Sequence, residues 1–312
     1  MRIVLFILKC LVGICATLGL IVIALAAFGF WASEALQEDW AGGEELPDSA
    51  VLQLDLSAGV TEAAAQNPFA RLGLGAALPL RDALDALQAA AGDQRVKALY
   101  AHLGSGPLSL AQAQELRAAI QAFTASGKPA IAFAETFGEG GDGTVHYYLA
   151  SAFDEVWVQP SGELAFTGFS METPYLRGAL DDLGIEPRLS QREEYKGFAN
   201  TFTDREMPEP VRENLSQLIQ SWLTQVAGDI AADRALEERA VLSAIDRAPL
   251  SAPDAKTAQL IDEIGYQDQA EAAVLAESGD GAGFYRLRDY ARQLRREAPA
   301  PESGPAIAVI TG

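Results

Sequence analysis

Lys196 is one residue that could serve as a general base. It lies in the segment REEYKGFANTF, just after the strand-like run EPRLSQ (residues 186–191) and just before a long amphipathic helix. A lysine acts as a general base only when neutral, which requires burial or cationic neighbours that lower its pKa from about 10.4. Tyr195 and Phe198 offer an apolar setting, whereas the carboxylates of Glu193 and Glu194 favour the charged ammonium. On local sequence alone, a lysine in this context is most simply a surface residue.

Two hydroxyl groups are candidate nucleophiles, because Thr144 and Ser151 flank the segment VHYYLA. The simpler interpretation is a helix that packs on a sheet and is capped by Thr144. His146 lies in the same segment, and no Ser/Asp pair with a nucleophile-elbow motif surrounds it. We therefore expect His146 to be a helix residue rather than a catalytic base.

Two glycine-containing turns could supply backbone amides to an oxyanion. The first is FGEGGDGTV (residues 137–145), in which Glu139 and Asp142 make phosphate binding unfavourable and weaken the case for an oxyanion site. The second is LGSGPLS (residues 103–109), which is equally compatible with a plain turn.

Composition excludes several classes of function. The 312 residues include 23 Lys and Arg against 43 Asp and Glu, a net charge of −20, and this acidity opposes nucleic-acid binding. The chain has two histidines, His102 and His146, and two cysteines, without a CxxC motif. We therefore expect no metal site and no cofactor.

The N-terminal segment is typical of a membrane anchor. The 24 residues from Cys10 to Ser33 carry no formal charge and would extend about 36 Å as a helix. Arg2 and Lys9 precede this run, and acidic residues follow it, so the N-terminus is predicted to be cytoplasmic and the remainder exported. Residues 1–33 are thus predicted to form one transmembrane helix.

A cleaved secretory peptide is the alternative, since Ala24-Leu25-Ala26 resembles a cleavage site. The apolar run is longer than the usual 7 to 15 residues of such peptides. Residues 34–48, which are acidic and contain glycine and proline, are predicted to form a tether between the membrane and the globular part.

From residue 49 to residue 297, apolar runs and helical periodicities alternate, which predicts an α/β domain with a parallel sheet covered by helices. Ser109 and Gln112 have capping-box spacing. The predicted helix 208–233 has one apolar face, which indicates packing within the chain or a subunit contact. The predicted strands are 50–56, 96–103, 129–134 and 155–158, and the predicted helices are 80–91, 109–124, 146–151 and 208–233.

The C-terminal segment predicts the start of a further domain. Residues 298–305 (APAPESGP) have the composition of a linker, and residues 306–312 begin with the strand-like run AIAVIT. Six strand residues cannot form a domain alone. We therefore expect this sequence to be part of a longer protein.

Several of these segments together resemble one protein family. They are the anchor, the run GKPAIAFAE…YYLASAFDEVWVQPSGELAFTGFS, the segment YKGFANTFTDREMPEPVRENLSQLIQSW and the later APDAKTAQLIDEIGY. The chain resembles bacterial signal peptide peptidase, or protease IV, over roughly residues 50–312. The likeness is to the long form, whose two repeats are crotonase/Clp-protease-like α/β domains.

The resemblance implies a serine endopeptidase with a Ser-Lys dyad. Tyr195-Lys196, followed by Arg205-Glu206-Met207-Pro208, matches the segment that holds the family's lysine, so Lys196 becomes the expected general base. The family's nucleophile lies in a Ser-Gly-Gly-Tyr turn of the second repeat, which this sequence does not reach. No nucleophile is therefore expected within these residues.

The corresponding turns of this first repeat look degenerate. Thr144-Val145-His146-Tyr147 stands where the serine turn would be, and Leu103-Gly104-Ser105-Gly106-Pro107 stands where the oxyanion turn would be. A non-catalytic pseudo-peptidase that anchors, assembles or regulates is therefore the main alternative. An acyl-CoA enzyme on the same architecture is a weaker one.

The resemblance also implies substrate, assembly and location. The expected substrates are cleaved signal peptides, cut in their apolar core, and the expected assembly is a homotetramer. The expected location is the bacterial inner membrane, reached through residues 10–33, with the globular part on the periplasmic side.

Overall fold

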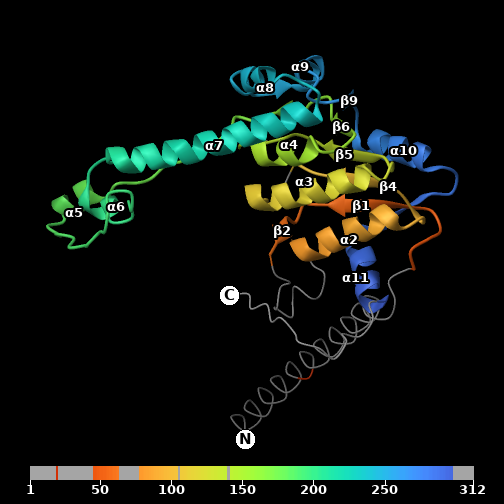
Figure 1. Ribbon diagram of the computed structural model, residues 1–312, viewed down its shortest axis with the longest axis horizontal. Helices are drawn as coiled ribbons and strands as arrows, with labels where there is room; N and C mark the ends of the chain where they lie inside the picture. The colour runs from red at the N-terminus through yellow and green to blue at the C-terminus, as the bar shows by residue number, and fades with distance from the viewer. Residues whose placement is uncertain (1–18, 20–44, 63–76, 105, 139–140, 298–312) are drawn as a thin grey trace, which may run out of the picture.

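A six-stranded parallel sheet lies at the centre of the described residues (Figure 1). The computed structural model describes residue 19 and residues 45–62, 77–104, 106–138 and 141–297. In order across the sheet, the strands are β10 (Gly283–Arg286), β1 (Ala50–Asp55), β4 (Val96–His102), β5 (Ala130–Ala134), β6 (Glu155–Val158) and β9 (Glu263–Ile264). Two small pairs accompany it, namely β2 (Val60–Thr61) with β3 (Leu78–Pro79) and β7 (Glu163–Leu164) with β8 (Leu250–Ser251).

Helices cover both faces of this sheet. One face carries α2 (Leu80–Gly92), α3 (Leu110–Thr124), α4 (Thr144–Ala150) and α11 (Leu287–Glu297), and the other carries α10 (Gln267–Ser278). Burial on both faces explains why β5 reads AIAFA and is buried at every position. Two further helices, α8 (Glu238–Ile245) and α9 (Ala252–Thr257), flank β8. The predicted parallel sheet covered by helices is thus confirmed.

The predicted elements within this part of the chain begin and end within two residues of the observed ones. Ser109 caps α3 as predicted, because its hydroxyl accepts from the Gln112 amide and the Gln112 side chain accepts from the Ser109 amide. This reciprocal pair satisfies two amides that a helix start leaves without partners.

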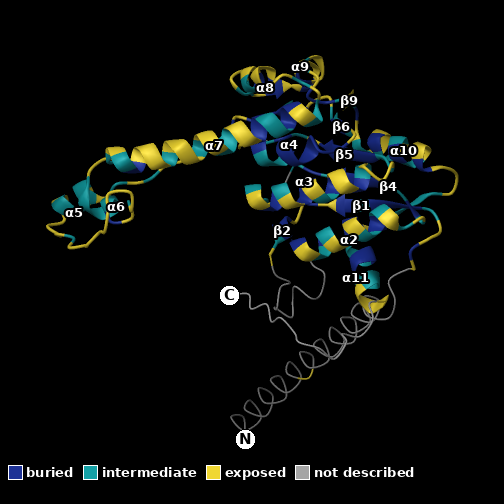
Figure 2. Cartoon of the chain, in the orientation of Figure 1, coloured by how far each residue is buried: buried dark blue, intermediate teal, exposed yellow. Residues whose placement is uncertain are grey.

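A long arm projects from the compact body (Figure 1). We call residues 171–225 the arm; they include α5 (Arg177–Asp182), α6 (Asn200–Thr203) and most of the long helix α7 (Glu209–Asp233). Figure 2 shows that α7 is exposed along most of its length and buried where it meets the body. Among the described residues, large exposed apolar side chains gather on the arm, with Tyr266 elsewhere. They are Met171, Leu176, Leu183, Ile185, Leu189, Tyr195, Phe198 and Leu218.

The apolar face predicted along α7 is therefore only partly used for packing within one copy of the chain. Val211 at one end and Val226 and Ile230 at the other are buried, whereas Leu218 in the middle is 40% exposed. The periodicity predicted the face correctly, but the body is too short to cover it.

Several predicted segments lie outside the described residues. They are the anchor (1–33) apart from residue 19, residues 34–44 of the tether, and residues 298–312, predicted as a linker and the start of a second repeat. Within the ranges that the structure describes, no helix is both long and apolar enough to span a bilayer.

Asp93 joins the end of α2 to α11. Its carboxylate accepts from the Arg95 amide and from Arg95 Nε and Nη2, at 2.9, 3.1 and 2.7 Å. The hydroxyl of buried Tyr290 in α11 donates to it at 3.1 Å. The hydrogen bonds from Arg95 lower the pKa of Asp93 to about 2, against the opposing effect of burial.

We expect Asp93→Asn to lower the free energy of unfolding at pH 7 by roughly 1 to 2 kcal/mol. A lowered carboxyl pKa contributes stability above the ordinary value near 3.9, and that stability is lost as the pH falls toward 2. Urea unfolding at pH 7 and pH 3 should therefore show a difference between wild type and variant that shrinks at the lower pH. Asp85→Asn, at an exposed i,i+4 pair with Arg81, is the control. A difference that does not change with pH would contradict this role.

Candidate functional site

The carboxyl edge of the sheet is where a parallel α/β domain ordinarily places its chemistry. Residues 103–109 leave β4 toward α3, and residues 135–143 leave β5 toward α4, so both glycine-containing turns lie at this edge. His146 joins them, because its Nε2 lies 3.0 Å from the carbonyl oxygen of Gly106. The structure thus brings together the segment that stands in place of the oxyanion turn and the segment that stands in place of the serine turn.

Thr144 lies at this edge but is fully buried. Its hydroxyl donates to Asp142 Oδ1 and accepts from the Gly168 amide at 2.9 Å. The Thr144 amide donates to the same Asp142 oxygen at 2.9 Å. With its hydroxyl satisfied and inaccessible, Thr144 is unsuited to attack a substrate.

The predicted capping role of Thr144 is wrong. The N-cap of α4 is Gly143, which has no side chain, and Thr144 is the first helical residue. The carboxylate of Asp142 accepts a hydrogen bond from the Thr144 amide instead. The acceptor for this helix start is therefore two residues before Thr144 in the chain. An acidic residue ahead of the helix was the available signal in the sequence.

His146 lies in α4 as predicted and has a packing role. Because a carbonyl only accepts, Nε2 must carry the proton that it donates to Gly106. Nδ1 is buried and has no hydrogen-bond partner among the described residues. Burial lowers the pKa of His146, against opposing effects of the Gly106 hydrogen bond and of Asp142. The neutral ring thus ties α4 to the turn after β4.

That turn is tightly packed against the end of β1. Gly104 and Gly106 have φ of 97° and 86°, conformations that glycine adopts without strain. A Cβ on Gly106 would lie 2.3 Å from the Leu56 carbonyl oxygen. Both glycines are thus required by packing, and Ser105, between them, lies outside the described residues.

Ser151 is also buried, and it belongs to a charged network. Its Oγ accepts from Arg117 Nη1 at 2.8 Å and lies 3.1 Å from Asp233 Oδ2. Arg117 Nη2 donates to the same oxygen of Asp233 at 2.6 Å. Sequence reasoning missed this network, because a single arginine in an amphipathic helix is most simply interpreted as solvated.

Lys196 lies on the arm, in an irregular segment between α5 and α6, and is exposed. The strand-like sequence just before it, residues 186–191, forms no strand. Among the described residues, Lys196 has no ion pair, and the Glu193 φ of 62° marks the turn that precedes it. Tyr195 and Phe198, which flank it, are 48% and 79% exposed, so within one copy of the chain they do not enclose the lysine.

The structure separates Lys196 from the two hydroxyl candidates. Gly197 is packed on Val211 near the start of α7, since a Cβ there would lie 2.6 Å from Val211 Cγ2. Ser151 contacts Asp233 at the other end of the same helix. The 22 residues between Val211 and Asp233 span about 33 Å in a helix. No dyad forms from Lys196 with Thr144 or Ser151 of the same chain.

Other polar groups at the edge were not predicted. His102 Nε2 lies 2.8 and 3.0 Å from the two oxygens of Glu135, where β4 and β5 end. Within the described ranges, no group of three or more His, Cys, Asp or Glu side chains is arranged to hold a metal ion.

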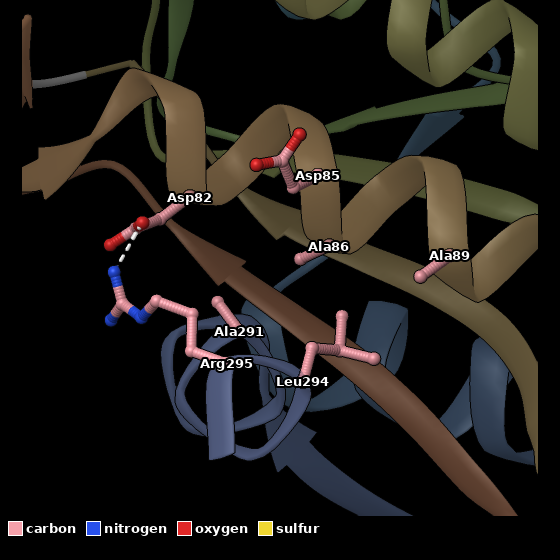
Figure 3. Close-up of a pocket in the computed structure, with 7 residues that line it drawn as sticks. All are labelled: Asp82, Asp85, Ala86, Ala89, Ala291, Leu294 and Arg295. Atoms are coloured by element: carbon pink, nitrogen blue, oxygen red, sulfur yellow. Dashed lines mark hydrogen bonds and ion pairs between the residues drawn. The ribbon is translucent and has the colours of Figure 1, made fainter. Parts of the chain in front are cut away.

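A pocket of about 290 Å³ between α2 and α11 offers no alternative active site (Figure 3). Four of the residues that line it are alanine or leucine, and its charged groups are already paired. Asp82 binds Arg295, and Asp85 binds Arg81 at 2.8 Å. Figure 3 shows the first of these pairs, which joins α2 to α11.

Comparison with known proteins identifies relatives of this architecture. The sequence profile described as "Peptidase family S49" matches residues 122–279, which include α4, Lys196 and α7. "Protease 4" of Haemophilus influenzae is 30% identical over 146 residues, 46% of this chain and 22% of that protein. "Serine protease SPPA, chloroplastic" of Arabidopsis thaliana is 24% identical over 180 residues, 58% of this chain and 26% of that protein. The aligned residues thus span about a quarter of each relative.

Solved structures with similar folds have low sequence identity. A mutant of the "1510-N membrane-bound stomatin-specific protease" has a TM-score of 0.38 and 11% identity, over 72% of this chain and 84% of that one. "Crystal structure of an enoyl-CoA hydratase/ carnithine racemase from Magnetospirillum magneticum" has a TM-score of 0.36 and 15% identity, over 72% and 73%. Similarity of this degree assigns no activity.

We expect Thr144→Val to lower the free energy of unfolding by about 1 to 3 kcal/mol, because it leaves buried partners of the hydroxyl unsatisfied. Thr144→Ser keeps the hydroxyl and should lie closer to wild type. Urea unfolding of both variants measures the difference. If Thr144→Val were as stable as Thr144→Ser but lost peptide cleavage, the hydroxyl would be a nucleophile rather than a structural group.

Proposed function

The chain belongs to peptidase family S49, and on that basis we propose that it forms part of a serine endopeptidase of the signal peptide peptidase type. Lys196 is its general base. The observation that carries this proposal is that the matched residues 122–279 contain the Tyr195-Lys196 segment and the helix start after Met207-Pro208. The fold we propose is accordingly of the crotonase/Clp-protease type.

The mechanism requires a serine from beyond the described residues. Lys196 Nζ removes the proton of that serine hydroxyl as its oxygen attacks the substrate carbonyl, and the proton then passes to the leaving amine. Water, activated by the same neutral amine, releases the acyl group. A lysine acts as a general base only when neutral, which burial favours, and Lys196 is exposed in one copy of the chain, so the surface that supplies the serine must also bury it.

We propose a second copy of this chain as the cover of the arm. The arm holds the exposed apolar residues named above together with Lys196, and in one copy nothing among the described residues encloses them. Covering them with a like arm would remove apolar area from water and desolvate the lysine in one step. Four copies are expected from the family resemblance.

The proposed substrates are apolar peptides left in the membrane after secretory cleavage. Residues 10–33 would anchor the protein in the inner membrane with the body on the periplasmic side, near such peptides. The net charge of −20 leaves no electrostatic basis for nucleic-acid binding. No cofactor takes part in the proposed reaction.

A pseudo-peptidase is the second candidate, and a specific observation favours it. Thr144 at the carboxyl edge and Ser151 at the other end of α4 are both buried and hydrogen-bonded, so neither hydroxyl is available to a substrate. In that case the chain would supply anchoring and assembly alone.

Lys196→Ala should reduce kcat for cleavage of an apolar peptide by at least about 100-fold, because a general base contributes 10² to 10⁴ in rate. The assay uses the membrane protein expressed from its complete coding sequence. Arg192→Ala, which removes an exposed cation from the same segment, is the matched control and should keep wild-type turnover. Unchanged turnover in Lys196→Ala would remove the lysine from the mechanism, and absence of any peptide cleavage by wild type would favour the pseudo-peptidase.

Phe198→Glu should weaken self-association by roughly 10-fold or more, because burying a phenylalanine side chain contributes about 1.5 to 3 kcal/mol. Sedimentation in detergent gives the mass of the assembly as a function of concentration. Tyr266→Glu, at an exposed aromatic position on the body, is the control. An assembly equally stable in both variants would exclude the arm as the interface.

A further inference from the structure

The arm joins the body at two places, through the chain just before residue 171 and through the C-terminal end of α7, and the ring of Trp222 on α7 contacts that of Phe169 before the arm. The residues of α7 buried against the body are Val226, Ala227, Ile230 and Ala231, all in its last two turns. From Arg212 to Gln225, the side chains are exposed or half-buried, as Figure 2 shows. The buried contacts of α7 with the body are thus confined to its C-terminal end, so the way this end is fixed bears directly on the direction of the arm.

Two aspartates on those turns bind buried groups of the body. Asp233 accepts from Arg117 Nη2 at 2.6 Å and from Gln121 Nε2 at 3.0 Å, both on α3. Asp229, one turn earlier, accepts from the hydroxyl of Tyr148 on α4 at 2.5 Å. Together, these contacts tie α7 to two different helices of the body.

Arg117 is the centre of this network. Its side chain is 5% exposed and that of Asp233 is 13% exposed. The guanidinium carbon lies 4.1 Å from the centre of the Tyr148 ring, and Nη1 also binds Ser151 Oγ and the Tyr148 carbonyl. We define Arg117, Tyr148, Ser151, Asp229 and Asp233 as the clamp.

The clamp restricts the tilt and rotation of α7, which apolar packing alone does not fix. Apolar contacts are non-directional, so Val226 and Ile230 could stay buried while α7 tilts or rolls. Hydrogen bonds tolerate little change in distance and angle, and separating Arg117 from Asp233 would leave a buried charge without its partner. With acceptors one turn apart, the clamp restricts both the tilt and the rotation of α7.

A small tilt at the clamp is a large displacement at the lysine. Fifteen residues separate Val226, at the edge of the body, from Val211, on which Gly197 packs, and this is about 22 Å of helix. A tilt of about 10° would move Val211, and Lys196 beside it, by about 4 Å. A misplacement of 1 Å can cost about 100-fold in rate at a catalytic group.

We propose that the clamp residues are positioning residues, which hold the direction of α7 and thereby the place at which Lys196 meets its partner serine. This inference rests on the proposed role of Lys196. The inference assigns a function to the buried pair of Arg117 and Asp233 at the base of the arm. About 33 Å of helix separates Asp233 from Val211, beside which Lys196 lies.

The test pairs two tyrosines with the same chemistry. Tyr148→Phe removes the hydroxyl that binds Asp229, and Tyr290→Phe removes the hydroxyl that binds Asp93, far from the arm. Both tyrosines are 1% exposed. A loss of stability alone should thus affect the two variants alike.

The direction of the arm is measured by double electron–electron resonance. Spin labels are attached through Glu115→Cys on α3 and Glu186→Cys on the arm, both exposed positions, in a Cys10→Ser and Cys15→Ser background of the full chain. We expect Tyr148→Phe to widen the distance distribution at least about twofold and to lower kcat at least about 10-fold with KM little changed. Tyr290→Phe should leave both quantities at wild-type values.

Arg117→Lys is the second variant, since it keeps the charge but loses the planar fork that binds three groups at once. It should widen the distance distribution further than Tyr148→Phe does. A wild-type distribution in both clamp variants would overturn the proposal. So would a widened distribution with unchanged turnover, in a protein that Lys196→Ala inactivates. Full activity of Lys196→Ala would instead refute the proposed base, and the distances would still decide whether the clamp holds the arm.

Discussion

The buried guanidinium of Arg117 is the constraint on which the arrangement of this molecule depends. A charge with 5% of its side chain exposed has to be paired, and the carboxylate that pairs with it belongs to the last turn of α7. Because the same guanidinium binds the Tyr148 carbonyl and Ser151, α3, α4 and α7 are fixed relative to one another by one side chain. The sheet supports α3 and α4, and among the described residues the charged contacts between arm and body are made through the last turns of α7.

Two groups at the edge of the sheet where such folds ordinarily hold their chemistry have structural roles here. The Thr144 hydroxyl binds Asp142 and Gly168, and His146 donates to the Gly106 carbonyl. At the opposite end of α4, the Ser151 hydroxyl accepts from Arg117. All three groups thus help to fix α4 against its neighbours. In the proposed mechanism, the peptidase chemistry therefore depends on Lys196 of the arm and on the surface that covers it.

The sequence predicted features that depend on interactions between residues close together in the chain, and it did not predict those that depend on distant residues. Apolar periodicity and the Ser109 capping box are local, so they predicted the four central strands and the helices α2, α3, α4 and α7 within two residues, whereas the edge strands β9 and β10 were not predicted. The cap of α4 was mispredicted because Asp142 and Thr144 both have side chains that can cap a helix. In the structure Asp142 supplies the acceptor, and Thr144 is already part of the helix. The position of Lys196 could not be predicted, because it depends on the direction of α7, and that helix is tied to the body by a contact between Arg117 and Asp233, which lie 116 residues apart in the chain.

The exposed arm and the exposed lysine pose the same physical problem. Apolar side chains such as Phe198 and Leu183, at 79% and 72% exposure, forgo about 25 cal/mol for each Å² that a partner could cover. A lysine in water stays protonated and cannot take a proton from a hydroxyl. One surface that covered the arm would remove this apolar area from water and would also favour the neutral amine of the lysine. The clamp sharpens this argument, since a surface can cover the lysine and present a serine to it only if the arm that carries the lysine points in one direction.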